Sequence, residues 1–290
     1  MMINNNHADI LSQLDAMRVQ EATTICFNYF ERNSDCIDEV CRKSMVTWIQ
    51  QVQKTLGISP ETVWIAVSFF DRYLSSGKGN SRGVLGSKCK FQLAAITAFY
   101  TAVKIYEPVV LSIDMLIMIC RDTYTEADIV SMEKDILTAL EWRVSCYTPM
   151  DFARSLLQLL NDEDVSSDVS DSLLKACQMH LDIAVTDMHL SCRTPASSLG
   201  TSCLASSLTH SDILSLSEKQ SIWGQLTELC GFDLSSREVI AAQQCLLSHS
   251  STCKPNDASK YNSLLQQSNI TRSASSTSSP ICVSKTARQA

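Results

Sequence analysis

One run of thirteen residues, Phe91 to Val103, constrains the fold of this chain more than any other feature. The run reads FQLAAITAFYTAV, and a helix with this sequence is apolar on nearly every face, so other helices must surround it. It is shorter than the ~18 residues that a membrane-spanning helix requires, as is every other apolar run in the sequence. The run therefore predicts the central helix of a helical bundle in a soluble protein.

Periodicity and capping residues predict four more helices around this central one, two before it and two after it. The capping signals are Gly57 as a stop, Ser59 and Pro60 as a start, Ser112 as the start of a short helix to about Arg121, and Thr125 with Asp128 as a capping box. The apolar stripes are Cys41, Met45, Trp48, Val52 and Leu56; Val63, Val67, Phe70 and Leu74; and Ile129, Met132, Ile136 and Leu140. The unit breaks near Trp142.

The same order of signals repeats in the second half of the chain. Thr148, Pro149 and Asp151 suit the N-cap, first-turn and third positions of a new helix, and an acidic spacer follows that helix. The later signals are a stripe of Leu173, Leu174, Cys177, Leu181 and Ala184; Thr194-Pro195 before Ala196, Leu199, Cys203 and Leu204; Ile222, Trp223, Leu226 and Leu229 before Gly231; and Ser235 with Glu238 as the cap of the last helix. The pattern favours an all-α protein with two tandem five-helix units.

Both ends of the chain differ from these two units. Residues 1–34 are typical of a loosely amphipathic helical leader, with Ile10, Leu14, Met17, Ala22 and Phe27 as its apolar points. Fifteen of the 41 residues from 250 to 290 are Ser or Thr, and such a segment cannot bury enough apolar surface to offset its chain entropy. The predicted organisation is therefore a leader (1–34), a first unit (35–147), a second unit (148–249) and a disordered tail (250–290).

Charge, the N-terminal sequence and the cysteines indicate which kinds of partner, which compartment and which thiol state to expect. The net charge is −7 overall and −11 over residues 1–249, so the folded body repels nucleic acid and anionic lipid. The opening MMINNNHADI lacks the pattern of a signal peptide, which favours the nucleus and cytoplasm. The thirteen cysteines contain no C-x-x-C pair and the five histidines are scattered, so we expect mostly buried, reduced thiols and no metal site.

The sequence offers no catalytic constellation. It has no G-x-S-x-G, no H-E-x-x-H and no phosphate-binding loop, so we expect neither enzymatic activity nor a cofactor. Two charged residues stand where the helical pattern favours apolar ones: Lys104 follows the central run directly, and Glu133 follows Met132. Periodicity alone favours a snorkelling lysine and a solvated glutamate.

The stretch from Cys41 to Phe152 resembles the cyclin box. It reads CRKSMVTWIQQV, ETVWIAVSFFDRYLS, FQLAAITAFYTAVKIYE, YTEADIVSMEKDILTALEW and TPMDF in the order and spacing of that family. Five positions that the family holds nearly fixed are present as Arg42, Asp71, Leu93, Lys104 and Glu133. The resemblance implies two cyclin-fold domains and a non-catalytic subunit that binds and activates a cyclin-dependent Ser/Thr protein kinase.

The resemblance also assigns roles to residues. Lys104 and Glu133 match the pair that hydrogen-bonds main-chain groups beside the C-helix of the kinase, and Phe91, Ile105 and Tyr106 are candidates either for apolar contact around that pair or for core packing. Arg42 and Asp71 match an internal ion pair that joins the first two helices, and Leu93 matches a core position. The family's substrate-docking patch, which binds substrate or inhibitor peptides, matches Cys41, Met45, Trp48, Gln51 and Gln92, with core packing of Met45 and Trp48 as the alternative.

The subtype and the regulation follow from shorter matches. CRKSMVTW with TPMDF, and ACQMHLDIAVTDMHL with TPASSLGTSCLASSL, look most like the D-type group, and no RxxLxxxxN motif stands near the N-terminus, so G1/S control is expected. Ser279, which precedes Pro280, is a candidate phosphorylation site. Two other classes stay open: a cyclin-fold adaptor in transcription, although that class brings a zinc ribbon and a basic surface, and a helical scaffold without a kinase.

Overall fold

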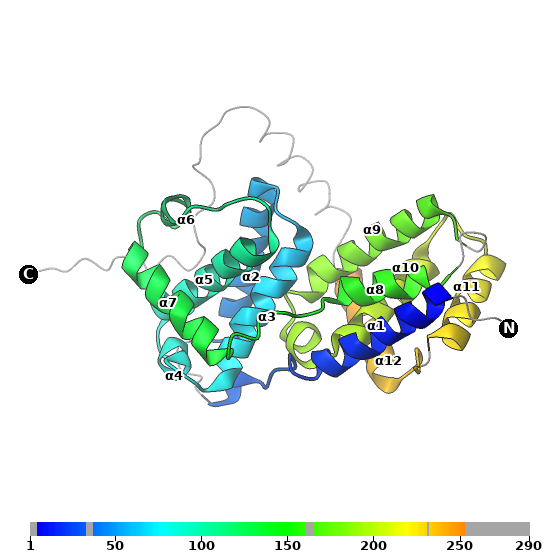
Figure 1. Ribbon diagram of the computed structural model, residues 1–290, viewed down its shortest axis with the longest axis horizontal. Coiled ribbons are helices and arrows are strands. Elements are labelled where there is room, and N and C mark those ends of the chain that lie inside the picture. The colour runs from blue at the N-terminus through cyan, green and yellow to red at the C-terminus, as the bar shows by residue number, and fades with distance from the viewer. Residues whose placement is uncertain (1–4, 33–36, 161–164, 231, 253–290) are drawn as a thin grey trace, which may run out of the picture.

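The computed structural model describes residues 5–32, 37–160, 165–230 and 232–252, and the regular structure in these ranges is helical without a strand (Figure 1). The predicted all-α class is therefore confirmed. The elements are α1 (Asn5–Glu21), η1 (Tyr29–Arg32), α2 (Glu39–Leu56), α3 (Pro60–Ser76), α4 (Ser81–Leu85), α5 (Lys88–Tyr106), α6 (Ile113–Ile119), α7 (Glu126–Ala139), α8 (Pro149–Gln158), α9 (Ser167–Ala184), η2 (His189–Arg193), α10 (Ala196–His210), α11 (Leu216–Leu229) and α12 (Arg237–Thr252). Within the described ranges, no helix has both the length and the apolar character that crossing a membrane requires.

Helix α5 is the centre of the first bundle, as the sequence predicts. Every residue from Phe91 to Val103 is buried, because α2, α3, α4 and α7 all pack against this helix. The neighbouring helices begin and end at the predicted caps. Gly57 adopts a left-handed conformation with φ of 66°, and Ser59 accepts a hydrogen bond from the Glu61 amide before Pro60 starts α3. Thr125 and Asp128 form the predicted capping box of α7.

Helix α10 takes the central place in the second bundle. It packs against α8, α9, α11 and α12, and its small residues let these neighbours approach closely. At Gly200, a Cβ atom would lie 2.3 Å from the carbonyl oxygen of Pro149, so the contact with α8 requires glycine. Thr148 and Asp151 form the predicted capping box at the start of α8. Figure 1 shows the two bundles side by side, joined by the segment between α7 and α8.

The leader differs from its prediction in length and in its apolar face. Ile10, Leu14 and Met17 are buried, but the helix ends at Glu21, and Phe27 is 81% exposed. Ala22 is exposed as well. The predicted apolar stripe does not extend to Ala22 and Phe27, because the helix ends before them in a turn. In this turn the hydroxyls of Thr23 and Thr24 donate to the carbonyl oxygens of Gln20 and Glu21.

The leader helix α1 packs on the second bundle, against α8 and α10 (Figure 1). The carboxylate of Glu21 accepts hydrogen bonds from the backbone amide and the hydroxyl of Ser197, at 2.8 and 2.7 Å. An acidic side chain at the start of α10 is favourable, because amides without helical partners and the positive end of the helix dipole face it. The guanidinium of Arg18 lies 4.8 Å from the ring centre of Phe232. The first residues of the chain therefore stabilise its second half.

One predicted helix cap was wrong, and two short helices were not predicted. The last helix is capped by Ser236, whose hydroxyl accepts from the Val239 amide, and not by Ser235, whose amide instead donates to Asp233. The short helix α4 and the π-helix η2 were not predicted, because neither is long enough to show a periodic stripe. The tail was predicted to be disordered from residue 250, but α12 continues to Thr252. The remaining residues of that tail, 253–290, lie outside the described residues, as do the stop at Gly231 and the phosphorylation candidate Ser279.

The cysteines are mostly buried, as the sequence predicts. Six of the ten described cysteines are buried, and Cys89 is the exposed one among these ten. Burial raises the pKa of Cys26 to about 12 and that of Cys177 to about 11, so these thiols remain protonated at neutral pH. They pack as small apolar side chains.

A buried ion pair between Arg42 of α2 and Asp71 of α3 joins the two bundles. The guanidinium donates to both carboxylate oxygens, from Nε at 2.9 Å and from Nη2 at 2.7 Å. The same guanidinium donates to the carbonyl oxygens of Val185 and Thr186 at 3.3 Å and to the Ser191 hydroxyl at 2.7 Å. These three acceptors follow α9, so Arg42 links the first bundle to the second.

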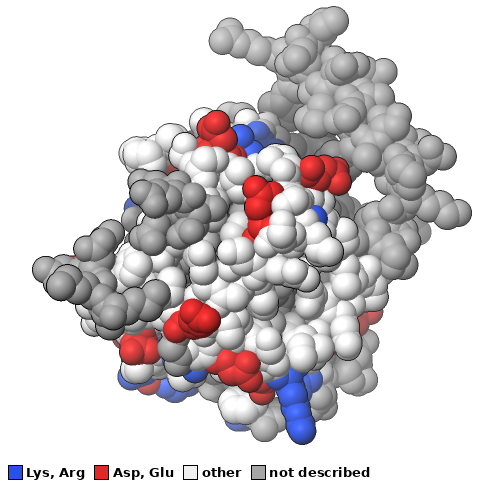
Figure 2. All heavy atoms as spheres, turned by 90° about the vertical axis from the view of Figure 1, so that its right-hand side faces the viewer, with Lys and Arg blue, Asp and Glu red and all other residues white. Residues whose placement is uncertain are grey.

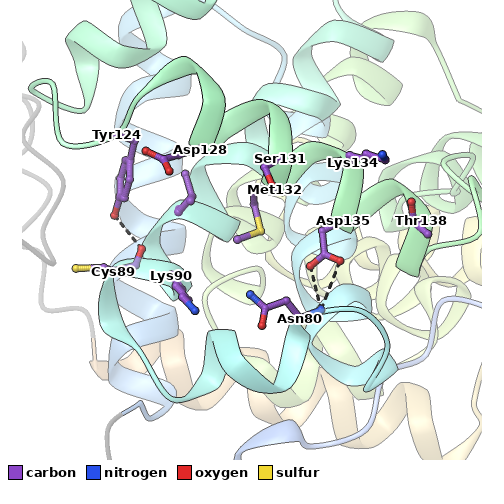
Figure 3. A pocket seen from close by; sticks show the side chains of 11 residues that line it. Asn80, Cys89, Lys90, Tyr124, Asp128, Ser131, Met132, Lys134, Asp135 and Thr138 are labelled. Carbon is purple, nitrogen blue, oxygen red and sulfur yellow. Dashed lines mark hydrogen bonds between the residues drawn. The ribbon is translucent and has the colours of Figure 1, made fainter.

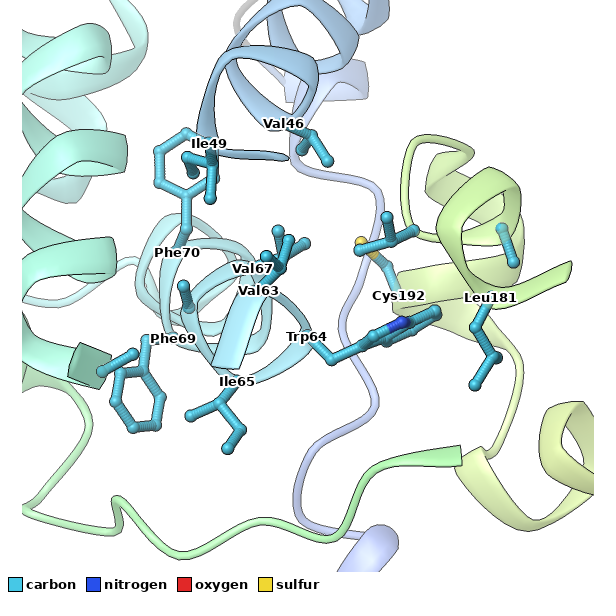
Figure 4. Close-up of a cluster of buried hydrophobic side chains, with 14 of the residues drawn as sticks. Val46, Ile49, Val63, Trp64, Ile65, Val67, Phe69, Phe70, Leu181 and Cys192 are labelled. Atoms are coloured by element: carbon cyan, nitrogen blue, oxygen red, sulfur yellow. The ribbon is translucent and has the colours of Figure 1, made fainter. Parts of the chain in front are cut away.

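Asp71 completes this link. It also accepts from the Tyr29 hydroxyl at 2.8 Å and from the Cys192 thiol at 2.9 Å. Burial, the largest single effect, lowers the pKa of Arg42, but the charge and hydrogen bonds of Asp71 together with Cys192 and Tyr29 outweigh burial and raise that pKa well above its ordinary value. Figure 4 shows the apolar surroundings, where Trp64 of α3 points toward Leu181 and Cys192 of the second bundle.

We predict that Asp71→Ala lowers the free energy of unfolding by roughly 3–5 kcal/mol, because it leaves the buried Arg42 charge without its partner. Urea denaturation followed by circular dichroism measures this change. Lys78→Ala, which removes an exposed partner of Glu141, is the control and should change stability by less than ~1 kcal/mol. Equal effects of the two substitutions would show that the Arg42–Asp71 pair is not needed for stability.

We also predict a loss of stability at mildly acidic pH through His180. Burial, followed by the nearby charge of His210, lowers the pKa of His180 below its ordinary value of 6.5. The unfolded chain therefore binds more protons than the folded chain as the pH falls below 6.5, and the free energy of unfolding decreases. Urea denaturation between pH 7.5 and about 5.5 should show a shallower decrease for His180→Gln. Identical slopes would contradict the prediction.

Candidate functional site

Lys104 and Glu133 form an ion pair on the surface of the first bundle. Lys104 lies in the last turn of α5 and Glu133 lies within α7, which packs beside it. The Lys104 Nζ atom lies 2.9 Å from Oε1 and 3.0 Å from Oε2 of Glu133. The lysine side chain is 45% exposed and the glutamate side chain is 15% exposed. Two residues that the sequence separates by 29 positions are thus brought together at one edge of the bundle.

Neighbouring residues hold this pair in place. The buried hydroxyl of Thr101 donates to Oε1 of Glu133 at 3.2 Å, and Nζ of Lys104 lies 5.0 Å from the ring centre of Tyr100. An ion pair with an exposed lysine contributes at most ~1 kcal/mol to stability, so stability does not explain why the bundle orients both side chains. The arrangement places a hydrogen-bond donor and a hydrogen-bond acceptor side by side at the surface.

Exposed apolar side chains lie on the two helices that carry Lys104 and Glu133 and on the segment between these helices. Ile105 and Tyr106, two residues of the predicted site, follow Lys104 directly and are both partly exposed, and the Tyr106 hydroxyl donates to the Val144 carbonyl at 2.8 Å. Five residues that the sequence analysis missed are also exposed on the following loop, on α6 and on α7: Val109, Val110, Met115, Met118 and Val130. We call these seven residues the apolar rim. Met115 and Met118 were missed because α6 has seven residues, too few to show a periodic stripe. Within α6, Leu116 is fully buried, and Ile113, Ile117 and Ile119 are partly buried against the core.

Phe91 was wrongly predicted as a contact residue. Its side chain is fully buried, and its ring centre lies 5.0 Å from that of Phe70. It also lies thirteen positions before Lys104 on the same helix, which corresponds to about 20 Å along the axis. The core interpretation of Phe91 is the correct one, because its side chain packs inside the first bundle, although residues 88–90 of the same turn are exposed.

The predicted structural residues lie where the resemblance implies. Arg42 and Asp71 form the buried pair described above, which confirms the internal ion pair between the first two helices. Leu93 is buried at 8% exposure and lies at the edge of the core. The resemblance did not indicate that Arg42 would also bind the second bundle, since those acceptors are backbone carbonyls without a sequence signal.

The predicted substrate-docking patch does not form an open surface in this structure. Met45 and Trp48 are fully buried, which favours the core alternative for both. Gln92 is buried and its side-chain oxygen accepts from the Tyr124 hydroxyl at 2.8 Å. Cys41 is partly exposed and Gln51 is exposed. The reason is geometric: the stripe of α2 that carries Met45 and Trp48 is the face that packs against α3 and α5.

A groove of about 670 Å³ lies between α4, the start of α5 and one face of α7 (Figure 3). Asp128 and Asp135 line its α7 side, and Lys90 lines its α5 side. Asp135 is held by the Tyr73 hydroxyl at 2.5 Å and by the Asn80 amide at 3.1 Å. Lys104 and Glu133 do not line this groove, so it is separate from the ion pair.

Comparisons with known proteins agree with this geometry. Residues 10–145 match the family model described as "Cyclin, N-terminal domain". The chain is 31% identical over 145 residues to G2/mitotic-specific cyclin-B3 of Canis lupus familiaris, covering 50% of this chain and 10% of that protein. It is 27% identical over 156 residues to Cyclin-A3-3 of Arabidopsis thaliana, covering 54% of this chain and 46% of that protein. Residues 10–145 are therefore similar to the cyclin N-terminal domain, the cyclin box.

The fold of the whole described chain has a parallel among solved structures. The X-ray structure of a viral cyclin from herpesvirus saimiri superposes with a TM-score of 0.61 at 18% identity, covering 80% of this chain and 96% of that one. This likeness confirms the cyclin fold of the two bundles. The matched segments span less than half the length of these curated relatives, and the relatives are B- and A-type cyclins, so the comparisons do not single out the D-type group.

We predict that Trp48→Ala lowers the free energy of unfolding by roughly 3–5 kcal/mol, because it leaves a cavity in the core of the first bundle. Gln51→Ala, one turn further along α2 on an exposed face, is the control and should change stability by less than ~0.5 kcal/mol. Urea denaturation measures both. A Trp48→Ala protein as stable as the unsubstituted chain would place this side chain on the surface instead.

Proposed function

We propose that this chain is a regulatory subunit that binds and activates a cyclin-dependent Ser/Thr protein kinase and performs no chemistry itself. The observation that carries the proposal is the Lys104–Glu133 pair, held at the surface of a cyclin box at the two positions that the family resemblance assigns to kinase binding. The geometry supplies what such binding needs, namely one cation and one carboxylate oriented on adjacent helices.

The pair is suited to bind main-chain groups of a partner. The ammonium of Lys104 donates to carbonyl oxygens, and the carboxylate of Glu133 accepts from amide hydrogens. Because the Thr101 hydroxyl already holds Oε1 of Glu133, this carboxylate keeps its orientation when Lys104 turns toward the partner. The apolar rim around the pair supplies area whose burial drives association.

Activation follows from differential affinity. A subunit without catalytic groups changes the activity of a kinase only by binding its active conformation more tightly than its inactive one. A rigid surface is suited to this role, because it selects one arrangement of the partner. Helix α5, buried from Phe91 to Val103, fixes the position of Lys104 relative to α7 and therefore supplies this rigidity.

The finer assignment rests on motifs alone. The resemblance of residues 41–48 and 148–152 to the D-type group supports a role in G1/S control in the nucleus and cytoplasm. The curated relatives above are B- and A-type cyclins, so their names do not support a role in G1/S control. The acidic net charge of −7 favours a kinase subunit over the alternative of a cyclin-fold transcription adaptor that contacts DNA.

The test measures binding and activation of purified cyclin-dependent kinases by the chain and by Lys104→Ala/Glu133→Ala. We predict that the double substitution weakens kinase binding by about 100-fold and removes activation, because charged groups at a desolvated interface cost several kcal/mol when truncated. Binding is measured by titration calorimetry, and activation by phosphorylation of a histone or retinoblastoma-derived peptide.

The chain provides a matched control for this test. Lys78 and Glu141 form a second exposed lysine–glutamate pair on the first bundle, and neither residue belongs to the predicted kinase-binding set or to the apolar rim. Lys78→Ala/Glu141→Ala should leave both binding and activation unchanged. Activation that survives loss of Lys104 and Glu133 would overturn the mechanism, and failure of every kinase to bind the unsubstituted chain would favour the helical scaffold.

A further inference from the structure

A second groove, of about 480 Å³, lies on the second bundle, and neither the ion pair nor the apolar rim contributes to it. One face of α9 forms its floor, with Leu173, Ala176, Met179, His180 and Ile183 at helical spacing. The end of α10, residues 211–213 and Leu247 of α12 complete the walls. The groove thus lies where three helices and a loop of the second bundle meet.

The walls of this groove leave apolar side chains uncovered. Met179 is 70% exposed, Ile213 is 63% exposed and Leu247 is 39% exposed, although all three line one groove. Asp212 lies on the rim beside Ile213. Exposed apolar side chains gathered in a groove with a polar rim are typical of a binding site for a peptide segment.

The C-terminal segment of this chain starts beside the groove. Helix α12 ends at Thr252, five residues after Leu247. The sequence that follows contains Lys260, Tyr261, Leu264 and Leu265, the first apolar cluster of residues 253–290. The nine residues from Thr252 to Tyr261 span up to about 30 Å when extended, whereas the floor from Leu173 to Ile183 is about 15 Å long. The cluster can therefore reach any part of the groove.

Charge complementarity favours this segment as the occupant. Residues 148–252 contain five basic and thirteen acidic residues, a net charge of −8, whereas residues 253–290 contain five basic residues and one acidic residue, a net charge of +4. Residues 1–147 carry only −3, so the attraction is stronger toward the second bundle. Figure 2 views the molecule from the second-bundle side and shows acidic side chains scattered over a largely uncharged surface.

We propose that residues 260–265 bind in this groove of their own chain. Tyr261, Leu264 and Leu265 occupy the apolar floor beside Met179, and the ammonium of Lys260 faces Asp212 on the rim. Attachment to α12 supplies a high effective concentration, so the segment covers the groove even though the contact area is small. A partner that uses this groove must then compete with the chain's own C-terminal segment.

Photo-crosslinking in the full chain tests this proposal. Met179 is replaced by p-benzoylphenylalanine, the protein is irradiated, and crosslinked peptides are identified by mass spectrometry. We expect crosslinks from position 179 to residues 253–270 within one chain. Met118 of α6, which is 65% exposed on the first bundle, is the matched control position and should give about tenfold less crosslink to this segment.

Leu264→Ser/Leu265→Ser, introduced with the probe at position 179, should lower the crosslink yield about tenfold, because two buried leucines are lost from the groove. Raising the salt concentration to about 0.5 M should also lower the yield, since it screens the attraction between the segment and the second bundle. Crosslinks to a second copy of the chain, no crosslinks at all, equal yields from positions 118 and 179, or a yield that the leucine substitutions leave unchanged would overturn the proposal.

Discussion

The packing of the leader and the two bundles against one another depends on the hydrogen bonds and the ion pair that the buried carboxylate of Asp71 makes. This carboxylate is buried on α3 and accepts hydrogen bonds from three separate parts of the chain: Arg42 of α2, Tyr29 of the leader and Cys192 of the second bundle. Arg42 extends the connection to carbonyls that follow α9. A charge buried this deeply is tolerated only when it is fully paired, so each of these segments must be in place for the others to be stable.

This connection determines what the surface of the first bundle can do. With α2 and α3 fixed around α5, the last turn of α5 and the middle of α7 meet at one edge, where Lys104 and Glu133 face each other. Apolar side chains between Ile105 and Val130 in the sequence are exposed as well. The function that we propose therefore needs no moving part of this chain, because the partner adapts to a surface that the core already holds rigid.

The sequence predicted the helices well because their signals are local. Apolar periodicity and capping residues act within a few positions, so Gly57, Thr125 and Thr148 mark helix ends that the structure reproduces. The ion pair of Arg42 and Asp71 and the meeting of Lys104 with Glu133 were predicted only through the family resemblance, since neither pair is close in sequence. Periodicity alone predicted that Lys104 extends its charged end into solvent and that Glu133 is solvated, each without a partner protein.

The predictions that the structure does not reproduce concern contacts for which the sequence has no local signal. For Phe91, Met45 and Trp48 the sequence left contact and core packing as alternatives, because a stripe that packs a helix into a bundle looks the same in sequence as a stripe that binds a partner; the structure buries all three. The position of α1 on the second bundle was not predicted either, because the bonds from Glu21 to Ser197 join residues 176 positions apart. Of the apolar rim, Ile105 and Tyr106 were predicted, but Met115 and Met118 were missed, since α6 is too short to show which of its faces is buried.

A structure of the complex with a cyclin-dependent kinase is the most direct test of the central claim. The account predicts that Nζ of Lys104 and the carboxylate of Glu133 lie within about 3 Å of main-chain atoms of the kinase, with the apolar rim buried around them. A complex in which the pair remains exposed to solvent, while the kinase binds elsewhere on the chain, would contradict it.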